Sequence, residues 1–238
     1  MIQHKNMHKQ IHKHLLKLQK LPRSKTHPLI YHINKKFHIS KRTLFYIKEY
    51  GPHSNTAHVI IRESLNIIIL ASILSSFGGR ALESIRTLFI SVTPLLIMLP
   101  ILNDLIGDYG AVVSSRFSTM LHRGEVSKEP FDTPLLRKLI KQILVIACIT
   151  GSVCIALGFI TSSFTGYVLT MQDVMKITFI VFADIFFLII LIFFLAVYVG
   201  TYFDKRKKDP SNFLVPTTTA VADVGNMILL AMLVRVFY

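Results

Sequence analysis

An aspartate lies inside an apolar run near the end of the chain, in "FLVPTTTAVADVGNMILLAMLV". No Lys or Arg stands close to Asp223 in sequence, and a carboxylate in hydrocarbon is costly unless it pairs, meets water or binds a cation. At helical spacing, Thr219, Asp223 and Asn226 share one stripe with Pro216. An oxygen-only set of this kind predicts a site for a hard cation such as magnesium, calcium or manganese. A hydrogen-bond network between helices is the alternative.

A second acidic pair occurs in "PILNDLIGDYGAVVSS". Asp104 and Asp108 stand four residues apart, so their carboxylates stack on one face if the helix persists. Two such charges repel each other, which suits a hydrated cation and suits plain lipid badly. Small residues follow at Gly107, Gly110 and Ser114, where another helix can approach or water can enter. These residues extend the predicted cation site to a second helix.

One more acid, Asp184, lies in the most continuous apolar run, within "VFADIFFLII". An ion or proton site and a hydrogen bond to another helix are equally good interpretations of it.

The elements that hold these residues are predicted to be membrane helices. The chain is 52% hydrophobic, with a mean hydropathy of +0.52, which is too apolar for an ordinary soluble domain. Apolar windows of about 19 residues predict five spans. They run over about Ser64–Phe77, Leu88–Thr119, Ile143–Phe164, Ile177–Tyr202 and Phe213–Phe237. Pro94, Pro100 and a centre with Gly and Asp are expected to interrupt the second. The fold class is therefore an all-α polytopic membrane protein of five transmembrane helices, preceded by a short basic N-terminal helical segment.

Charge gives the expected orientation. Of the 27 Lys and Arg, 23 precede residue 64 or lie in the second and fourth connections, and four lie in the other connections and at the C-terminus. Because cytoplasmic loops are enriched in Lys and Arg, the N-terminus is expected inside and the C-terminus outside, in the plasma membrane. No signal peptide is expected at the start of the chain. The predicted division is 1–58, basic and His-rich, and 59–238, the membrane domain.

The basic segment carries less specific information. Residues 1–25 suit either an amphipathic helix on anionic lipid or a solvated tail, and residues 26–58 suit a small folded piece next to the membrane. A nucleic-acid partner is not favoured. No soluble-enzyme motif and no bound cofactor are expected. Cys148 and Cys154 are predicted to be buried apolar side chains rather than a disulfide or a metal pair.

The stretches "LPILNDLIGDYGAVVSSRFSTMLHRGE" and "DPSNFLVPTTTAVADVGNMILL" resemble the membrane domain of MgtE-type magnesium transporters. The resemblance covers roughly residues 60–238. Within the family, the two stretches more specifically resemble archaeal half-size members and the repeats of eukaryotic solute-carrier relatives. It implies a dimer of five-helix units with a pore lined by the second and fifth helices. It also implies a central ion ligand at Asp223, and Asp108 stands where the family has Asn, adding one charge per subunit.

The expected function is transport of a divalent cation, most simply magnesium, by a homodimer in a lipid bilayer. The predicted ligands are Asp223, Asp108, Asp104, Asn226 and Thr219. A proton- or sodium-coupled exchanger, with Asp104, Asp108 or Asp184 as the coupling site, is the first alternative. A membrane-anchored protein that binds lipid or nucleic acid through its basic segment is the second. The basic segment leaves no room for the regulatory modules of bacterial relatives, so gating of that kind is not expected.

Overall fold

The structure is a computed structural model that describes residues 13–15, 17, 28–39, 44, 47, 56–126, 129–206 and 208–238. These residues form helices and turns and no strand, which confirms the all-α class. A short 3₁₀ turn at Pro130–Asp132 precedes α7. The helices are α2 (Pro28–Phe37), α4 (Thr56–Glu83), α5 (Arg86–Ser91), α6 (Thr93–Arg123), α7 (Pro134–Ser163), α8 (Met171–Lys205) and α9 (Ser211–Phe237).

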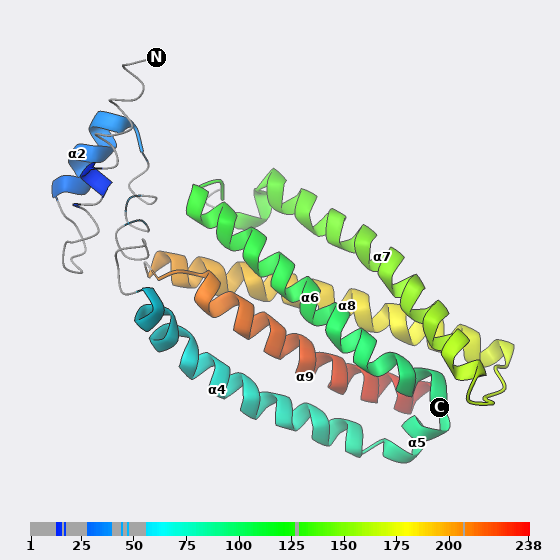
Figure 1. The fold of residues 1–238 in the computed structure, drawn as a ribbon. Coiled ribbons are helices and arrows are strands. Elements are labelled where there is room, and N and C mark those ends of the chain that lie inside the picture. The colour runs from blue at the N-terminus through cyan, green and yellow to red at the C-terminus, as the bar shows by residue number, and fades with distance from the viewer. Residues whose placement is uncertain are drawn as a thin grey trace.

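Five long helices run side by side in Figure 1, with α4 and α7 at opposite edges. Helix α9 lies between α4 and α6 and packs against both, as well as against α8. Helix α6 packs against α7, α8 and α9, so it touches every other helix of the 93–237 region. One continuous apolar core joins these helices, and α8 is the most deeply buried of them. The two motif-bearing segments, α6 and α9, are therefore direct neighbours.

Four helices in the described part of the chain are long and apolar enough to cross a membrane: α6, α7, α8 and α9. Helix α7 exposes a row of large apolar side chains, including Ile149 at 61% and Val153 at 52%. A contiguous apolar surface of this kind is expected against lipid rather than water. The fifth predicted span falls in α4, which does not meet the same criterion, so a five-span count stays a prediction.

Helix α6 corrects the expected interruption of the second span. The chain breaks earlier, at Val92 between α5 and α6, and then continues as one helix from Thr93 through Pro100 to Arg123. Pro94 stands in the first turn, where its missing N–H costs nothing. Gly124 ends the helix with φ 72°, a left-handed conformation that glycine adopts without strain. The acids of α6 thus lie on an unbroken helix.

Helix α7 begins at Pro134, about nine residues before the predicted span, because its basic first turns continue the helix beyond the apolar run. Its two cysteines are free. Cys154 is buried as expected, but Cys148 is exposed, so the prediction of burial is wrong there. The six-residue spacing turns Cys148 toward the outer face of α7.

Most of the basic N-terminal segment lies outside the described residues, including most of residues 1–25, where an amphipathic helix or a solvated tail is predicted. Within the described part, α2 packs Ile30 and Ile33 against Leu44 in a small cluster separate from the main core. The domain division at residue 58 stays a prediction.

Candidate ion site between helices α6 and α9

Helices α6 and α9 approach each other along a stripe of small residues. A Cβ atom added at Gly110 would stand 3.5 Å from the backbone of Thr218, so the two backbones are close to van der Waals contact there. The Thr218 hydroxyl lies 2.7 Å from the Ser114 hydroxyl and donates to the carbonyl oxygens of Gly110 at 3.3 Å and Leu214 at 2.8 Å. The small residues of α6 therefore serve close helix packing, as the sequence predicts.

A chain of amide hydrogen bonds crosses between the helices about two turns further along. The Asn103 Nδ2 donates to Asp223 Oδ1 at 3.0 Å, and the Asn226 Nδ2 donates to Asn103 Oδ1 at 3.0 Å. Asn226 is fully buried and Asp223 is half-buried. The two residues of α9 that share the predicted stripe are thus joined through one residue of α6.

Two oxygen atoms of this network remain open. Asn226 Oδ1 is buried and accepts no hydrogen bond from the described residues. Asp223 Oδ2 likewise accepts none within the described part of the chain, and no Lys or Arg there forms an ion pair with Asp223. A carboxylate whose only donor is a neutral amide keeps its charge uncompensated in a membrane span. Asp223 can therefore bind a cation or a proton at its carboxylate, with Asn226 Oδ1 as a second oxygen acceptor nearby.

Thr219 lies one helical turn before Asp223 and is half-buried. Its methyl group faces Gly107, where an added Cβ would stand 3.9 Å from Thr219 Cγ2 and 3.8 Å from Asp223 Oδ1. Gly107 therefore leaves room for about one methyl group next to Asp223 Oδ1. No hydrogen bond joins Thr219 to Asp223 in the described chain, so the structure places Thr219 next to the network without making it a member.

Asp104 and Asp108 do not enter this network. Both side chains are exposed, because α6 turns its Asn103, Gly107 and Gly110 face toward α9. Within the described residues, no group of three or more Asp, Glu, His or Cys side chains is arranged to hold a metal ion. A single protomer thus brings together Asp223 and Asn226, and leaves the two α6 carboxylates on its surface.

The stretch Gly107-Asp108-Tyr109-Gly110 divides its side chains among three directions. Asp108 points outward, the two glycines face α9, and the Tyr109 hydroxyl hydrogen-bonds the Thr150 hydroxyl of α7. At Gly110 the α9 backbone comes close enough that even a Cβ atom would touch Thr218.

Asn103 is the residue that sequence reasoning missed. It stands beside Asp104 in "ILNDLIG", and an amide inside an apolar run is itself a signal. A second intramembrane amide, Asn226, is the natural complement, because amides both donate and accept.

Asp184 lies on the buried face of α8, one turn from Ile180 and one turn from Leu188, which are also buried. The side chain is 0% exposed, and neither carboxylate oxygen has a hydrogen-bond partner among the described residues. The predicted alternative, a hydrogen bond from Asp184 to another helix, is therefore absent among the described residues. Lys176, one possible partner, instead lies 4.7 Å above the Tyr238 ring.

Comparison with known proteins gives one match. The family model named MgtE, described as a divalent cation transporter, matches residues 99–233, which is more than half of the chain. The matched region runs from α6 into α9 and includes Asn103, Asp104, Asp108, Asp223 and Asn226. Neither a curated protein nor a solved structure matches the chain.

Proposed function

Since the chain belongs to the MgtE family of divalent cation transporters, we propose that it transports magnesium, with the ion passing between α6 and the same helix of a second copy beside Asp223. The family is one of transporters rather than enzymes, and its match spans four apolar helices, which argues against an inert membrane anchor. Magnesium is the cation proposed because the available ligands are oxygen atoms only, and because it keeps most of its waters where protein ligands are few.

The uncompensated carboxylate of Asp223 carries this proposal. Its Oδ1 accepts the hydrogen bond from Asn103 and is the oxygen nearest Gly107, whereas its Oδ2 accepts no hydrogen bond from the described residues. A hydrated magnesium ion needs this kind of charge, together with acceptors for its water molecules. The buried Oδ1 of Asn226 and the hydroxyl of Thr219 are candidate acceptors.

A homodimer follows from the outer face of α6. Asp104 and Asp108 are exposed on a helix that is apolar enough to span the membrane, and two carboxylates facing lipid are costly. A second copy related by a two-fold axis would cover this face with the same two acids, around a water-filled path. Four carboxylates of α6 would then concentrate cations along the path that leads to Asp223.

The proposed membrane arrangement adds α4 as the fifth span. Its 28 residues correspond to about 42 Å of helix, enough to cross a bilayer. It exposes Ile68, Ile69 and Phe77, which suit lipid. Five spans place the N-terminus in the cytoplasm and the C-terminus outside a plasma membrane, in agreement with the distribution of Lys and Arg.

Asp184 favours a second candidate function, a proton-coupled exchanger. A buried acid without hydrogen-bond partners among the described residues is a natural place to hold a proton. In that mechanism Asp184 takes up or releases a proton while the cation moves at Asp223, so transport depends on the pH gradient.

The test is magnesium uptake into proteoliposomes that enclose a magnesium-sensitive fluorescent indicator, under a potassium diffusion potential that is negative inside. We expect Asp223→Asn to lose more than the roughly 10–100-fold that removal of an outer-shell partner costs a metal site. Glu83→Gln is the matched control, since it also turns an acid into an amide but lies at the exposed end of α4.

Each outcome separates the candidates. Uptake by wild type and Glu83→Gln, with none by Asp223→Asn, supports the ion path. Equal uptake by all three makes Asp223 a packing residue and overturns it. Uptake that follows an imposed pH gradient instead of the potential, and that loses this dependence in Asp184→Asn, replaces the channel with the exchanger. Calcium, manganese and cobalt in place of magnesium test which ion is preferred.

A further inference from the structure

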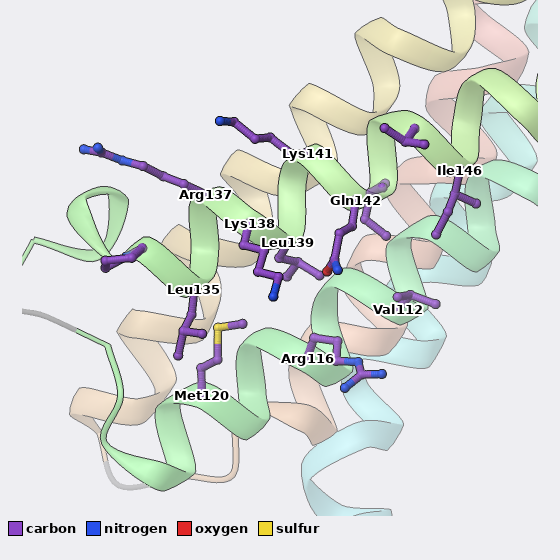
Figure 2. Close-up of a pocket in the computed structure, with 13 residues that line it drawn as sticks. Val112, Arg116, Met120, Leu135, Arg137, Lys138, Leu139, Lys141, Gln142 and Ile146 are labelled. Atoms are coloured by element: carbon purple, nitrogen blue, oxygen red, sulfur yellow. The ribbon is translucent and has the colours of Figure 1, made fainter.

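An open groove of about 1100 Å³ lies between the C-terminal half of α6 and the N-terminal half of α7. Its α6 wall begins at Val112, one helical turn beyond Asp108, and runs away from Asn103 to Met120. Figure 2 shows its two walls, with Met120 on α6 facing Leu135 on α7 and with Lys138 and Gln142 of α7 reaching toward α6. Arg116 also lines the α6 wall, with its guanidinium directed away from α7. The groove combines cationic and apolar side chains, which is the composition of a surface for an amphipathic ligand.

Among the residues that line the groove, four are basic and none is acidic. Lys138 and Gln142 point into the space between the two helices, whereas Lys141 and Arg137 point away from it (Figure 2). Arg137 is also occupied, since its Nη2 lies 2.7 Å from Asp132 Oδ1. Arg116 and Lys138 form no ion pair with any described residue. Two cations and an amide donor are therefore available to an anion.

The other side of the groove is apolar and continues toward the middle of α7. Val112 and Leu135 are each 43% exposed and Ile146 is 46% exposed. The exposed row goes on through Ile149 and Val153, so an apolar track leads away from the cations. The distance along α7 from Lys138 to Val153 is about 22 Å, enough for a fatty acyl chain to lie in contact throughout.

The depth of the cations fits the level of lipid phosphates. Helices α6 and α7 are about 46 Å and 45 Å long, whereas the hydrocarbon core of a bilayer is about 30 Å thick. Each helix end therefore extends about 8 Å into the headgroup region. Lys138 lies about 6 Å from the start of α7 and Arg116 about 10 Å from the end of α6. Long basic side chains at this depth reach the interface.

We propose that this groove binds an anionic phospholipid, with its phosphate among Arg116, Lys138 and Gln142 and one acyl chain along Leu135, Ile146 and Ile149. Basic pockets between membrane helices suit anionic headgroups. A soluble phosphate would not explain the apolar track. The second copy proposed above covers the outer face of α6 at Asp104 and Asp108, and a two-fold contact at the groove itself would bring Arg116 and Lys138 against the same cations of the partner. The lipid would brace the α6–α7 connection, and the binding does not depend on which ion is transported.

The chain contains no Trp, so an introduced Trp is an unambiguous reporter. Ile146→Trp places the reporter in the groove. Ile190→Trp is its matched control on α8, because Ile190 is 47% exposed and lies about 22 Å from the same end of the bundle, against about 18 Å for Ile146. The purified protein is reconstituted in bilayers of phosphatidylcholine and phosphatidylglycerol, with brominated acyl chains on one lipid at a time. Quenching of Trp fluorescence gives the relative affinity of the two lipids at each reporter.

We expect phosphatidylglycerol to be favoured at position 146 and not at position 190. Each cation near the surface contributes about a fivefold preference, so Arg116→Gln with Lys138→Gln should reduce the preference at position 146 roughly 25-fold or abolish it. Lys141→Gln, which removes the same charge from a side chain that points away, should leave most of the preference.

Three results overturn the proposal. Equal quenching by the two lipids at position 146 means that the groove does not select a charged headgroup. A preference that survives the double substitution, or that inorganic phosphate or glycerol phosphate removes, means that these cations do not hold a lipid. No quenching by either lipid at position 146, with normal quenching at position 190, means that another part of the protein or a second copy fills the groove.

Discussion

Asp223 and Asp184 both stand in long apolar runs, but their surroundings differ. Asp223 is half-buried, accepts a hydrogen bond from Asn103 on Oδ1 and keeps an Oδ2 that accepts none from the described residues. Asp184 is fully buried, and both of its oxygens are without partners in the described chain. The same residue type thus has polar neighbours on α9 and lies in an apolar core on α8.

The difference concerns which species each site can hold. An ion with its waters needs several acceptors, and Asn226 and Thr219 are candidates for that role beside Asp223. Asp184 has no such polar partner among the described residues, so a neutral, protonated acid is the form that such surroundings tolerate. Hydropathy marks both acids as exceptional, but only the neighbours distinguish a candidate cation site from a candidate proton site.

The largest expected effect comes from making Asp223 resemble Asp184. Asn103→Leu removes the donor to Asp223 Oδ1 and the acceptor for Asn226 Nδ2 in one step. Because Asn103 acts by holding a proposed ligand, we expect magnesium affinity, measured from the concentration dependence of uptake, to fall roughly 10–100-fold. Ser114→Ala is the control, since it removes a contact with Thr218 between the same two helices without touching Asp223. Uptake with unchanged affinity in Asn103→Leu would mean that the amide chain has no part in ion binding.

Sequence reasoning found the four helices that are apolar enough to cross a membrane, but not their rotation. The spans predicted over 177–202 and 213–237 lie within α8 and α9, because burial in lipid is what makes a span apolar. The rotation of α6 about its own axis was not predictable, since polar residues occupy two adjacent faces. Asn103 and Asp104 differ by about 100° around the helix, yet one faces α9 and the other is exposed.

The same limit explains Asp184. A sequence shows that an acid is buried in an apolar run, but it does not show which helices surround it. The resemblance to a family predicts a central role for Asp223, whereas the partner of its carboxylate in this protomer is known only from the packing of α6 on α9.

An intermediate effect is expected when Asp184 is made apolar. Asp184→Leu replaces two unpartnered oxygens with methyl groups of similar volume, so the protein should gain about 1–3 kcal/mol of stability. Thermal unfolding in detergent micelles measures it. Asp184→Asn is the control, because it keeps two unpartnered polar atoms and should bring no such gain. A loss of stability in Asp184→Leu would show that water or an ion serves this acid after all, and the contrast with Asp223 would disappear.

The smallest expected effect is on stability and concerns Asp209, an acid outside the spans that accepts several hydrogen bonds. Ser211 donates to its Oδ1 from the backbone at 3.0 Å and from the hydroxyl at 2.8 Å, and His122 Nε2 of α6 lies 3.2 Å away. Burial alone would raise the pKa of Asp209, but His122 and the Ser211 hydrogen bonds outweigh it, so its pKa is lowered. A lowered folded pKa adds stability that is complete above the unfolded value of about 3.9 and is lost as the pH falls through the folded value.

Wild type should therefore be more stable than Asp209→Asn near pH 6, and this advantage should shrink as the pH falls below about 4. Melting temperatures of the two proteins from pH 6 to pH 3 give the comparison. Parallel curves would mean that the contact between the end of α6 and the α8–α9 connection adds no charge-dependent stability. Curves that converge would instead complete a series of three acids, in which the number of donors around each carboxylate decides whether it stays charged by itself, needs a cation or holds a proton.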